Sequence, residues 1–191
     1  SRSGIDAETL MRVFLSLGSN LGDRLDLLTR AVRELGGSKG IRLVEVSRIY
    51  ETEPWETRPG QVADRAQWFL NCAVEIETAL SPQSLLERVQ EIERGLGRQP
   101  TRLSPEAQRY EPRTVDIDIL LYEAEVISAP DHLHIPHLLM HERGFVLWPL
   151  ADLAPEMEHP VLYQTVLELL DHLEDEHHVR PADLPLRWFS A

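Results

Sequence analysis

Apolar residues recur along this chain with two different spacings, and the order of these spacings predicts the core of the fold. Short runs rich in branched and aromatic residues, some with apolar and polar positions in alternation, indicate β-strands. Longer runs with apolar residues three or four positions apart indicate amphipathic helices. The predicted elements are a strand over 12–17, a helix from Asp23 to Leu35, a strand over 41–50, a strand over 68–78, a helix over 81–97 and a strand within 111–123.

The order strand, helix, strand, strand, helix, strand is that of the ferredoxin-like fold. We therefore expect an α+β protein with a βαββαβ core, in which a four-stranded antiparallel sheet carries both helices on one face. The other face of the sheet is left open for substrates. Two further helices are expected towards the C-terminus, one from Glu142 to Pro155 and an amphipathic one over 164–176.

The length of 191 residues is that of one ordinary domain. We expect a single domain over 12–173, preceded by an N-terminal extension, native or expression-derived, over 1–11 and followed by a C-terminal tail over 174–191. No stretch approaches the roughly 18 uninterrupted apolar residues of a membrane span, and the first residues lack the features of a secretory signal, so a cytoplasmic location is expected. The single cysteine, Cys72, lies in an apolar alternation and is expected in the core.

The chain is acidic, with a formal net charge of -13. This charge disfavours general attraction to nucleic acid or to anionic membranes, so neither is expected as a partner. No obligate protein partner is evident. An anionic substrate has to be bound by a local basic patch, and the basic residues apart from Lys39 are all arginines, which suit forked contacts to phosphate.

Asp116 and Asp118 interrupt the apolar run of the last predicted strand. Because aspartate is disfavoured in strands, two at alternate positions need an explanation. Alternation places both carboxylates on the open face together with Asn71, and it holds the two aspartates parallel and about 6 to 7 Å apart. A solvated outer face is one explanation. The other is a site for two Mg²⁺ ions that keep water and phosphate oxygens among their ligands.

The long loop before these aspartates is basic although the protein is acidic. Its charged residues from 98 to 113 are Arg98, Arg102, Glu106, Arg109, Glu111 and Arg113. Arginines beside a metal-binding carboxylate pair suit phosphoryl transfer, whose catalysis consists mostly of positioning phosphate and neutralising its charge. A solvated charged loop is the alternative. The P-loop, the GxGxxG motif and the kinase HRD motif are absent from the sequence, so a nucleotide would be bound by another design.

Five sequence stretches together resemble one enzyme family. They are "FLSLGSNLGDR", "YETEP", "FLNCAVEIET", "EPRTVDIDILLY" and "IPHLLMHERGFVLWPLADLAP". In this order they resemble the 6-hydroxymethyl-7,8-dihydropterin pyrophosphokinases of folate biosynthesis, over about residues 12–156. The resemblance implies the ferredoxin-like core and an activity that moves the β,γ-pyrophosphoryl group of ATP onto the hydroxymethyl oxygen of the pterin and releases AMP.

The resemblance also implies roles for individual residues. Asp116 and Asp118 would hold two Mg²⁺ ions between the phosphates of the co-substrate ATP and the pterin hydroxyl. The implied catalytic residues are Arg98, Arg113, Asp116 and Asp118. The implied ATP-binding residues are Gln90, Glu93, Arg98, Arg109, Arg113, Ile119, His137 and Arg143. The implied pterin-binding residues are Thr52, Pro54, Phe69, Asn71 and Phe145, of which the two phenylalanines would sandwich the flat ring and Asn71 would bind its edge.

The chain departs from the family pattern at three positions. Glu53 stands where proline occurs, Tyr110 where a bulky loop tryptophan is common, and Leu138 where an aromatic residue often follows the histidine. These departures concern loop closure and the contacts to adenine more than the reaction.

The stretch "HLHIPH" offers a different metal site, because His132, His134 and His137 are closely spaced. Pro136 disrupts any single helix or strand that would present all three. The resemblance instead assigns His137 to the nucleotide.

Two other classes of protein would use the same residues. A metal-dependent phosphohydrolase would need the aspartates and a water-directing base, but no paired aromatic rings. A non-catalytic binder of pterin or nucleotide would bind its ligands without forming AMP. Identification of the products formed from ATP, Mg²⁺ and the pterin separates these classes from a pyrophosphokinase.

Replacing Arg98 by alanine is expected to lower kcat more than substrate affinity, because the resemblance places this guanidinium on the group in transfer, where it acts mainly in the transition state. Loss of one such contact typically lowers the rate by about 10² to 10³. Steady-state kinetics with varied ATP measure both parameters. A change confined to KM would contradict this role.

Overall fold

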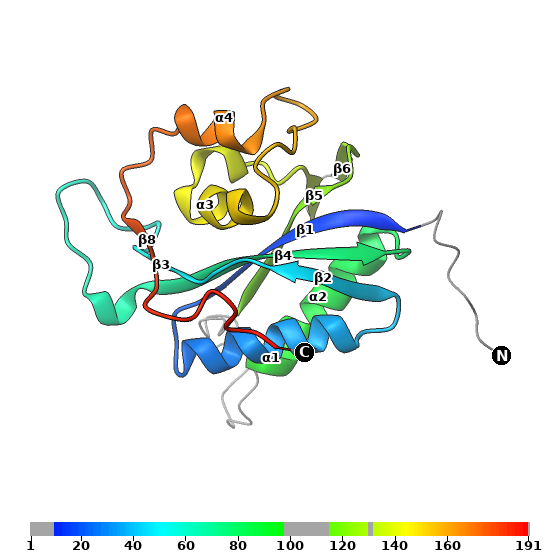
Figure 1. Cartoon of the computed structure of the whole chain (residues 1–191), viewed down its shortest axis with the longest axis horizontal. Coiled ribbons are helices and arrows are strands. Elements are labelled where there is room, and N and C mark those ends of the chain that lie inside the picture. Colours follow the sequence, from blue (N-terminus) through cyan, green and yellow to red (C-terminus); the bar gives the residue numbers. More distant parts are fainter. Residues whose placement is uncertain (1–9, 98–114, 130–131, 191) are drawn as a thin grey trace.

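A six-stranded sheet with antiparallel pairing forms the centre of the computed structural model, which describes residues 10–97, 115–129 and 132–190. Figure 1 shows the sheet between two layers of helices. The core elements are β1 (Met11–Ser19), α1 (Arg24–Gly37), β2 (Ile41–Val46), β3 (Tyr50–Thr52), β4 (Phe69–Thr78), α2 (Pro82–Gly97) and β5 (Asp116–Tyr122). This order confirms the predicted α+β class with a ferredoxin-like core.

The predicted strand over 41–50 is divided into β2 and β3, which follow one another along the same edge of β4. Ser47 lies at the division. Its hydroxyl accepts the N–H of Ala73 at 2.8 Å, and its own N–H donates to the Ala73 carbonyl at 2.9 Å. The irregular alternation of this stretch therefore reflects a break between β2 and β3, and at this break Ser47 is hydrogen-bonded to β4.

Helices α1 and α2 cover one face of the sheet because their apolar stripes meet the alternate apolar residues of the strands. The side chain of Asp23 caps α1 by accepting the N–H of Asp26 at 3.0 Å. Leu28 of α1 and Val89 of α2 are fully buried against this face. Within the described ranges, no helix is long and apolar enough to cross a membrane.

The opposite face of the sheet is partly covered by the C-terminal helices, which lie on the other side of the sheet from α1 in Figure 1. These are α3 (Gly144–Leu153) and α4 (Val166–Asp171), preceded by the hairpin of β6 (Ile127–Ala129) and β7 (Leu133–Ile135). Leu147 of α3 packs with Phe14 of β1 in a second buried cluster. This cluster covers one part of the sheet face that was expected to be open. The face is open only in the remaining part, where its residues are small or polar.

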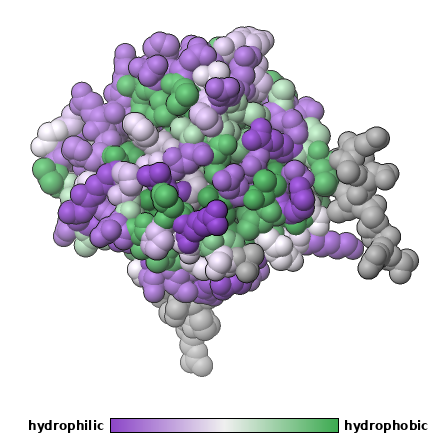
Figure 2. Space-filling view, viewed as in Figure 1, coloured by the Kyte–Doolittle hydropathy of each residue, from purple (hydrophilic) through white to green (hydrophobic). Residues whose placement is uncertain are grey.

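The chain after α4 returns to the sheet. The predicted helix over 164–176 ends at Asp171, and β8 (Val179–Pro181) pairs with β3 at the sheet edge. Further on, the indole of Trp188 donates to the carbonyl of Ser47 at 2.8 Å. These C-terminal residues therefore pack on the sheet. Figure 2 shows that hydrophilic and hydrophobic side chains lie side by side over the visible surface of the molecule.

Cys72 of β4 is fully buried in the core that α1 and α2 cover. Burial raises the pKa of its thiol to about 12. The expected core position of this residue is therefore what the structure shows.

Replacing Tyr50 by phenylalanine is expected to lower the free energy of unfolding by about 1 to 2 kcal/mol. Tyr50 is buried, and its hydroxyl donates to Asp152 Oδ1 of α3 at 2.9 Å in a partly buried bond that links α3 to β3. Urea denaturation measures the change. Tyr163→Phe is the matched control, because that side chain is 75% exposed, and equal stabilities of the two variants would contradict the role of the bond.

Candidate active site

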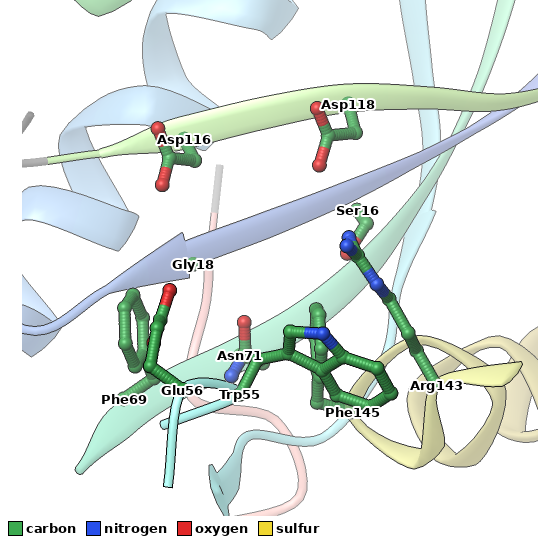
Figure 3. Close-up of a pocket in the computed structure, with 10 residues that line it drawn as sticks. All are labelled: Ser16, Gly18, Trp55, Glu56, Phe69, Asn71, Asp116, Asp118, Arg143 and Phe145. Carbon is green, nitrogen blue, oxygen red and sulfur yellow. The ribbon is translucent and has the colours of Figure 1, made fainter. Parts of the chain in front are cut away.

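A pocket of about 160 Å³ lies on the sheet face opposite α1 and α2, beside the first turn of α3. Figure 3 shows its lining, which comes from β1, the first residues of β4 and β5, the loop after β3 and the start of α3. The lining residues are Ser16, Gly18, Trp55, Glu56, Phe69, Asn71, Asp116, Asp118, Arg143 and Phe145. Three carboxylates against one guanidinium give the described lining a negative charge, which favours the binding of cations.

Asp116 and Asp118 line the pocket from β5, and Figure 3 shows both carboxylates on the same side of the strand. In the register with β1, Asp116 lies opposite Gly18 and Asp118 lies opposite Ser16. Alternate strand positions are about 6 to 7 Å apart. Because Ser16 and Gly18 are small, the space above β1 is open to the two partly exposed carboxylates of β5.

Asn71 of β4 lies opposite Gly18 on the other side of β1. Its Nδ2 donates to the hydroxyl oxygen of Thr52, and the residue is 3% exposed. A Cβ atom at position 18 would overlap Asn71 Oδ1. The bare backbone of Gly18 therefore makes room for the amide, and the bond to Thr52 leaves Oδ1 as an acceptor.

Among the described residues, three aromatic rings border the pocket. Phe69 begins β4, Phe145 lies in the first turn of α3, and Trp55 lies in the loop after β3, directly after the half-buried Pro54. Figure 3 shows Phe69 and Phe145 on opposite sides of Asn71. Trp55 contacts Phe145 edge-on, with ring centroids 6.1 Å apart and planes at 66°. A flat heteroaromatic ligand suits these walls, because its faces are apolar and its edge forms hydrogen bonds.

Arg143 precedes α3 and brings the one positive charge of the described lining. Its guanidinium carbon lies 5.2 Å from the ring centroid of Trp55 and 5.5 Å from that of Phe145. Its Nε is buried and has no hydrogen-bond partner in the part of the chain that the structure describes. A buried donor without a partner costs about 1 to 3 kcal/mol, so an acceptor on a ligand would stabilise this side chain.

His137 lies in the segment that follows β7, where the charge of Asp118 acts on its ring, but it is not among the residues that line the pocket. Its Nδ1 accepts the N–H of Leu139 at 3.3 Å, so Nε2 carries the proton of the neutral ring. Burial lowers the pKa of His137, and the charges of Arg143 and His134 lower it further, whereas Asp118 opposes them. The ring is therefore neutral at pH 7 and can donate through Nε2.

The remaining residues expected to bind ATP do not line the pocket with their described side chains. Gln90 is exposed on α2, and Glu93 Oε2 accepts the N–H of Ile117 at 3.2 Å, between the two aspartates. The side chain of Ile119 is buried in the core under α1 and α2 and so points away from the pocket. Arg98, Arg109 and Arg113, together with Tyr110, lie outside the described residues.

The three histidines of "HLHIPH" do not come together as a metal site. His132 Nε2 lies 3.1 Å from Gln83 Oε1, and His134 Nδ1 lies 3.3 Å from Ser128 Oγ. Among the described residues there is no group of three His, Cys, Asp or Glu side chains that could hold a metal ion. The zinc alternative gains no support from this geometry.

Four lining residues were not expected from the sequence: Ser16, Gly18, Trp55 and Glu56. Gly18 belongs to a stretch with the composition of a turn, yet it pairs within β1. The alternation of β1 could have indicated Ser16 and Gly18, because both lie out of phase with its apolar core residues. Trp55 and Glu56 lie in a loop without periodicity, which gives no signal for their position.

Comparisons with known proteins agree on one family. The family model described as 7,8-dihydro-6-hydroxymethylpterin-pyrophosphokinase (HPPK) matches residues 14–155. A 2-amino-4-hydroxy-6-hydroxymethyldihydropteridine pyrophosphokinase of Methylorubrum extorquens is 42% identical over 166 residues, which are 86% of this chain and 95% of that protein. The protein of the same name from Bacillus subtilis is 46% identical over 145 residues, which are 76% and 79% of the two chains.

Solved structures show the same fold within longer chains. Wild-type Plasmodium falciparum HPPK-DHPS with pteroate has a TM-score of 0.62 at 19% identity, covering 85% of this chain and 42% of that chain. The folic acid synthesis protein fol1 of Schizosaccharomyces pombe is 40% identical over 85% of this chain but only 20% of its own length. This chain therefore corresponds to one part of these larger proteins.

Replacing Gly18 by alanine is expected to displace the side chain of Asn71, because the added Cβ would overlap Oδ1. Overpacking of this kind costs about 1 to 3 kcal/mol of the free energy of unfolding. The side-chain amide signals of Asn71 in a ¹H–¹⁵N NMR spectrum report the displacement. Gly95→Ala is the control, since a Cβ there meets nothing within 4 Å, and unchanged Asn71 signals in Gly18→Ala would contradict the close approach.

Proposed function

This chain belongs to the 7,8-dihydro-6-hydroxymethylpterin-pyrophosphokinase family, and we propose that the pocket beside Asp116 and Asp118 is where it brings ATP and the pterin together. The protein is an ATP-dependent pyrophosphokinase of folate biosynthesis. It transfers the pyrophosphoryl group of ATP to the hydroxymethyl group of 6-hydroxymethyl-7,8-dihydropterin, which gives AMP and the pterin diphosphate. The placement rests on one observation: the carboxylate pair and the aromatic walls share a single pocket.

Asp116 and Asp118 would hold Mg²⁺, with two ions in our proposal. The donor set fits, because Mg²⁺ in phosphoryl-transfer sites takes one or two carboxylates and fills its other positions with water and substrate phosphate oxygens. The excess of carboxylates in the described lining favours such cations. When bound, the ions would neutralise the phosphate charge and lower the pKa of the attacking hydroxyl group.

Phe69 and Phe145 would stack on the two faces of the pterin, and Asn71 would bind its edge. The bond from Asn71 to Thr52 orients the amide before the ligand arrives, which reduces the entropy lost on binding. Asn71 and Asp116 lie opposite Gly18 on the two strands that pair with β1. They are therefore separated by two strand spacings, or about 10 Å. A flat ring over Gly18 would therefore reach from the amide towards the carboxylates, where its hydroxymethyl group would react.

Arg143 and His137 would bind the phosphates of ATP. The buried Nε of Arg143 has no partner among the described residues, and the neutral ring of His137 can donate through Nε2. Positive charge placed on the group in transfer stabilises the transition state. Further contacts to ATP are proposed for Gln90, Glu93, Arg98, Arg109, Arg113 and the backbone of Ile119, and further pterin contacts for Pro54.

Product analysis tests the function. Incubation with ATP, Mg²⁺ and the hydroxymethyl dihydropterin should give equal amounts of AMP and pterin diphosphate. Free phosphate without the pterin product would identify a phosphohydrolase, and binding of both ligands without any product would identify a non-catalytic binder. Chelation with EDTA should stop product formation, and an excess of Mg²⁺ should restore it.

Asp116→Ala and Asp118→Ala are each expected to lower kcat by at least about 10², because each removes a ligand of the ions that neutralise the phosphates. The free energy of unfolding should change by less than about 1 kcal/mol, since both side chains are partly exposed. Product formation and urea denaturation measure the two effects.

Asp171→Asn is the matched control, because Asp171 is exposed at the end of α4. It should retain normal turnover and stability. Near-normal turnover in either site variant would contradict the assignment of the metal ligands.

A further inference from the structure

The segment after α4 is bonded to the elements that form the pocket. The side chain of Asp175 is 1% exposed, and its Oδ2 accepts the N–H of Gly144, the first residue of α3, at 2.8 Å. Its Oδ1 lies 2.5 Å from Nδ1 of His177, and Nε2 of His177 lies 3.0 Å from the carbonyl oxygen of Thr57. The Asp175–His177 pair therefore joins α3 to the loop that carries Trp55.

His177 also stacks on Trp55, with ring centroids 4.8 Å apart and planes at 27°. Trp55 in turn contacts Phe145 and Arg143 in the pocket lining. Through these contacts a residue of the C-terminal segment reaches the wall of the pocket without lining it.

We propose that Asp175 and His177 are positioning residues that hold Trp55 as a wall of the pterin pocket, so that the C-terminal segment contributes to pterin affinity. Both residues lie after the family match, which ends at residue 155. The proposal rests on the proposed function, because it takes this pocket as the pterin site. Neither residue would touch the reacting atoms, and both would act through Trp55.

The segment does not need this side-chain pair in order to stay attached. Its backbone is bonded to the sheet through the pairing of β8 with β3, and the carbonyl of His178 accepts the N–H of Glu53 at 2.9 Å. A buried carboxylate is costly unless its oxygens are hydrogen-bonded, and both oxygens of Asp175 have partners. The pair is therefore a specific contact with the Trp55 loop added to a segment that the backbone already anchors.

Both ring nitrogens of His177 face acceptors, and only the imidazolium can donate to both. Burial lowers the pKa of His177, but the hydrogen bond and charge of Asp175, the carbonyl of Thr57 and the charge of Glu53 outweigh it and raise the pKa above 6.5. Other charged or titratable groups around this contact are Glu56, Arg58, Arg65, Arg143, Glu176 and His178.

The raised pKa sets the direction of the pH dependence. A group with a raised pKa contributes fully to the stability of the folded state when the pH is below its ordinary pKa, here 6.5. It loses that contribution as the pH rises through the folded-state pKa. Above that pKa the neutral ring can donate only one hydrogen bond. The KM for pterin in the unsubstituted protein should therefore rise with pH over this window.

His177→Ala in the full chain tests the proposal. It should raise the KM for the pterin roughly tenfold, as loss of hydrogen bonds to a charged group does, while kcat and the KM for ATP stay within about twofold. His178→Ala is the matched control, because that neighbouring side chain stacks on Trp68 and not on Trp55. It should leave all three parameters unchanged.

A double-substitution cycle with Trp55→Ala shows whether His177 acts through Trp55. In the Trp55→Ala background, His177→Ala should change the pterin KM by less than about twofold. His177→Gln should also abolish the pH dependence of the pterin KM. Additive effects of the two substitutions, or an unaltered pH profile in His177→Gln, would overturn the proposal.

The results also separate this proposal from the proposed function. Absence of AMP and pterin diphosphate with the unsubstituted protein would contradict the function itself. Normal activity with an unchanged pterin KM in His177→Ala would contradict only the role of the Asp175–His177 pair. A loss of apparent kcat in step with the folded fraction, with both KM values unchanged, would show a purely structural contact and would also overturn the proposal.

Discussion

The pairing of β1 with β4 on one side and with β5 on the other is the interaction on which the site depends. It places Gly18 between Asn71 and Asp116, which are distant in the chain and face the same space in the fold. Because side chains alternate along a strand, a shift of one residue would turn these groups towards the helices. The buried neighbours Leu17 and Ile117 oppose such a shift, since it would expose them to water. The hydrophobic core thus sets the geometry of the polar site.

The same sheet face has two environments. Towards the second half of β5, α3 packs on Phe14 and Leu120 in a dry cluster. Near the start of β5, the same face carries carboxylates, an amide and aromatic rings. The described lining has an excess of negative charge, so an unaccompanied polyphosphate would be repelled there, whereas one that carries cations would be attracted. This charge balance would explain how an acidic protein could bind ATP at a carboxylate pair, as we propose for Asp116 and Asp118.

Much of this arrangement could be predicted from local sequence patterns, because strand alternation is a local property. The apolar residues flanking Asn71, Asp116 and Asp118 are enough to assign all three to one face, without the register between the strands. Gly18 could not be assigned in this way, since its importance comes from the side chain of a neighbouring strand. Trp55 and His177 meet across the fold, in a loop and a segment without periodicity, and contacts of that kind leave no local signal. The pairing of β8 with β3 is likewise a contact between distant segments, and no local pattern predicts it.

The burial of Cys72 has a practical consequence. It is the only cysteine of the chain, and its buried thiol, with a pKa of about 12, has almost no thiolate at neutral pH. Alkylating reagents that attack thiolates therefore find no reactive thiol in the native molecule. A cysteine introduced at Val62, a position 93% exposed in the loop that also carries Trp55, would be the one reactive thiol. A single dye attached there could follow this loop in real time while the enzyme turns over.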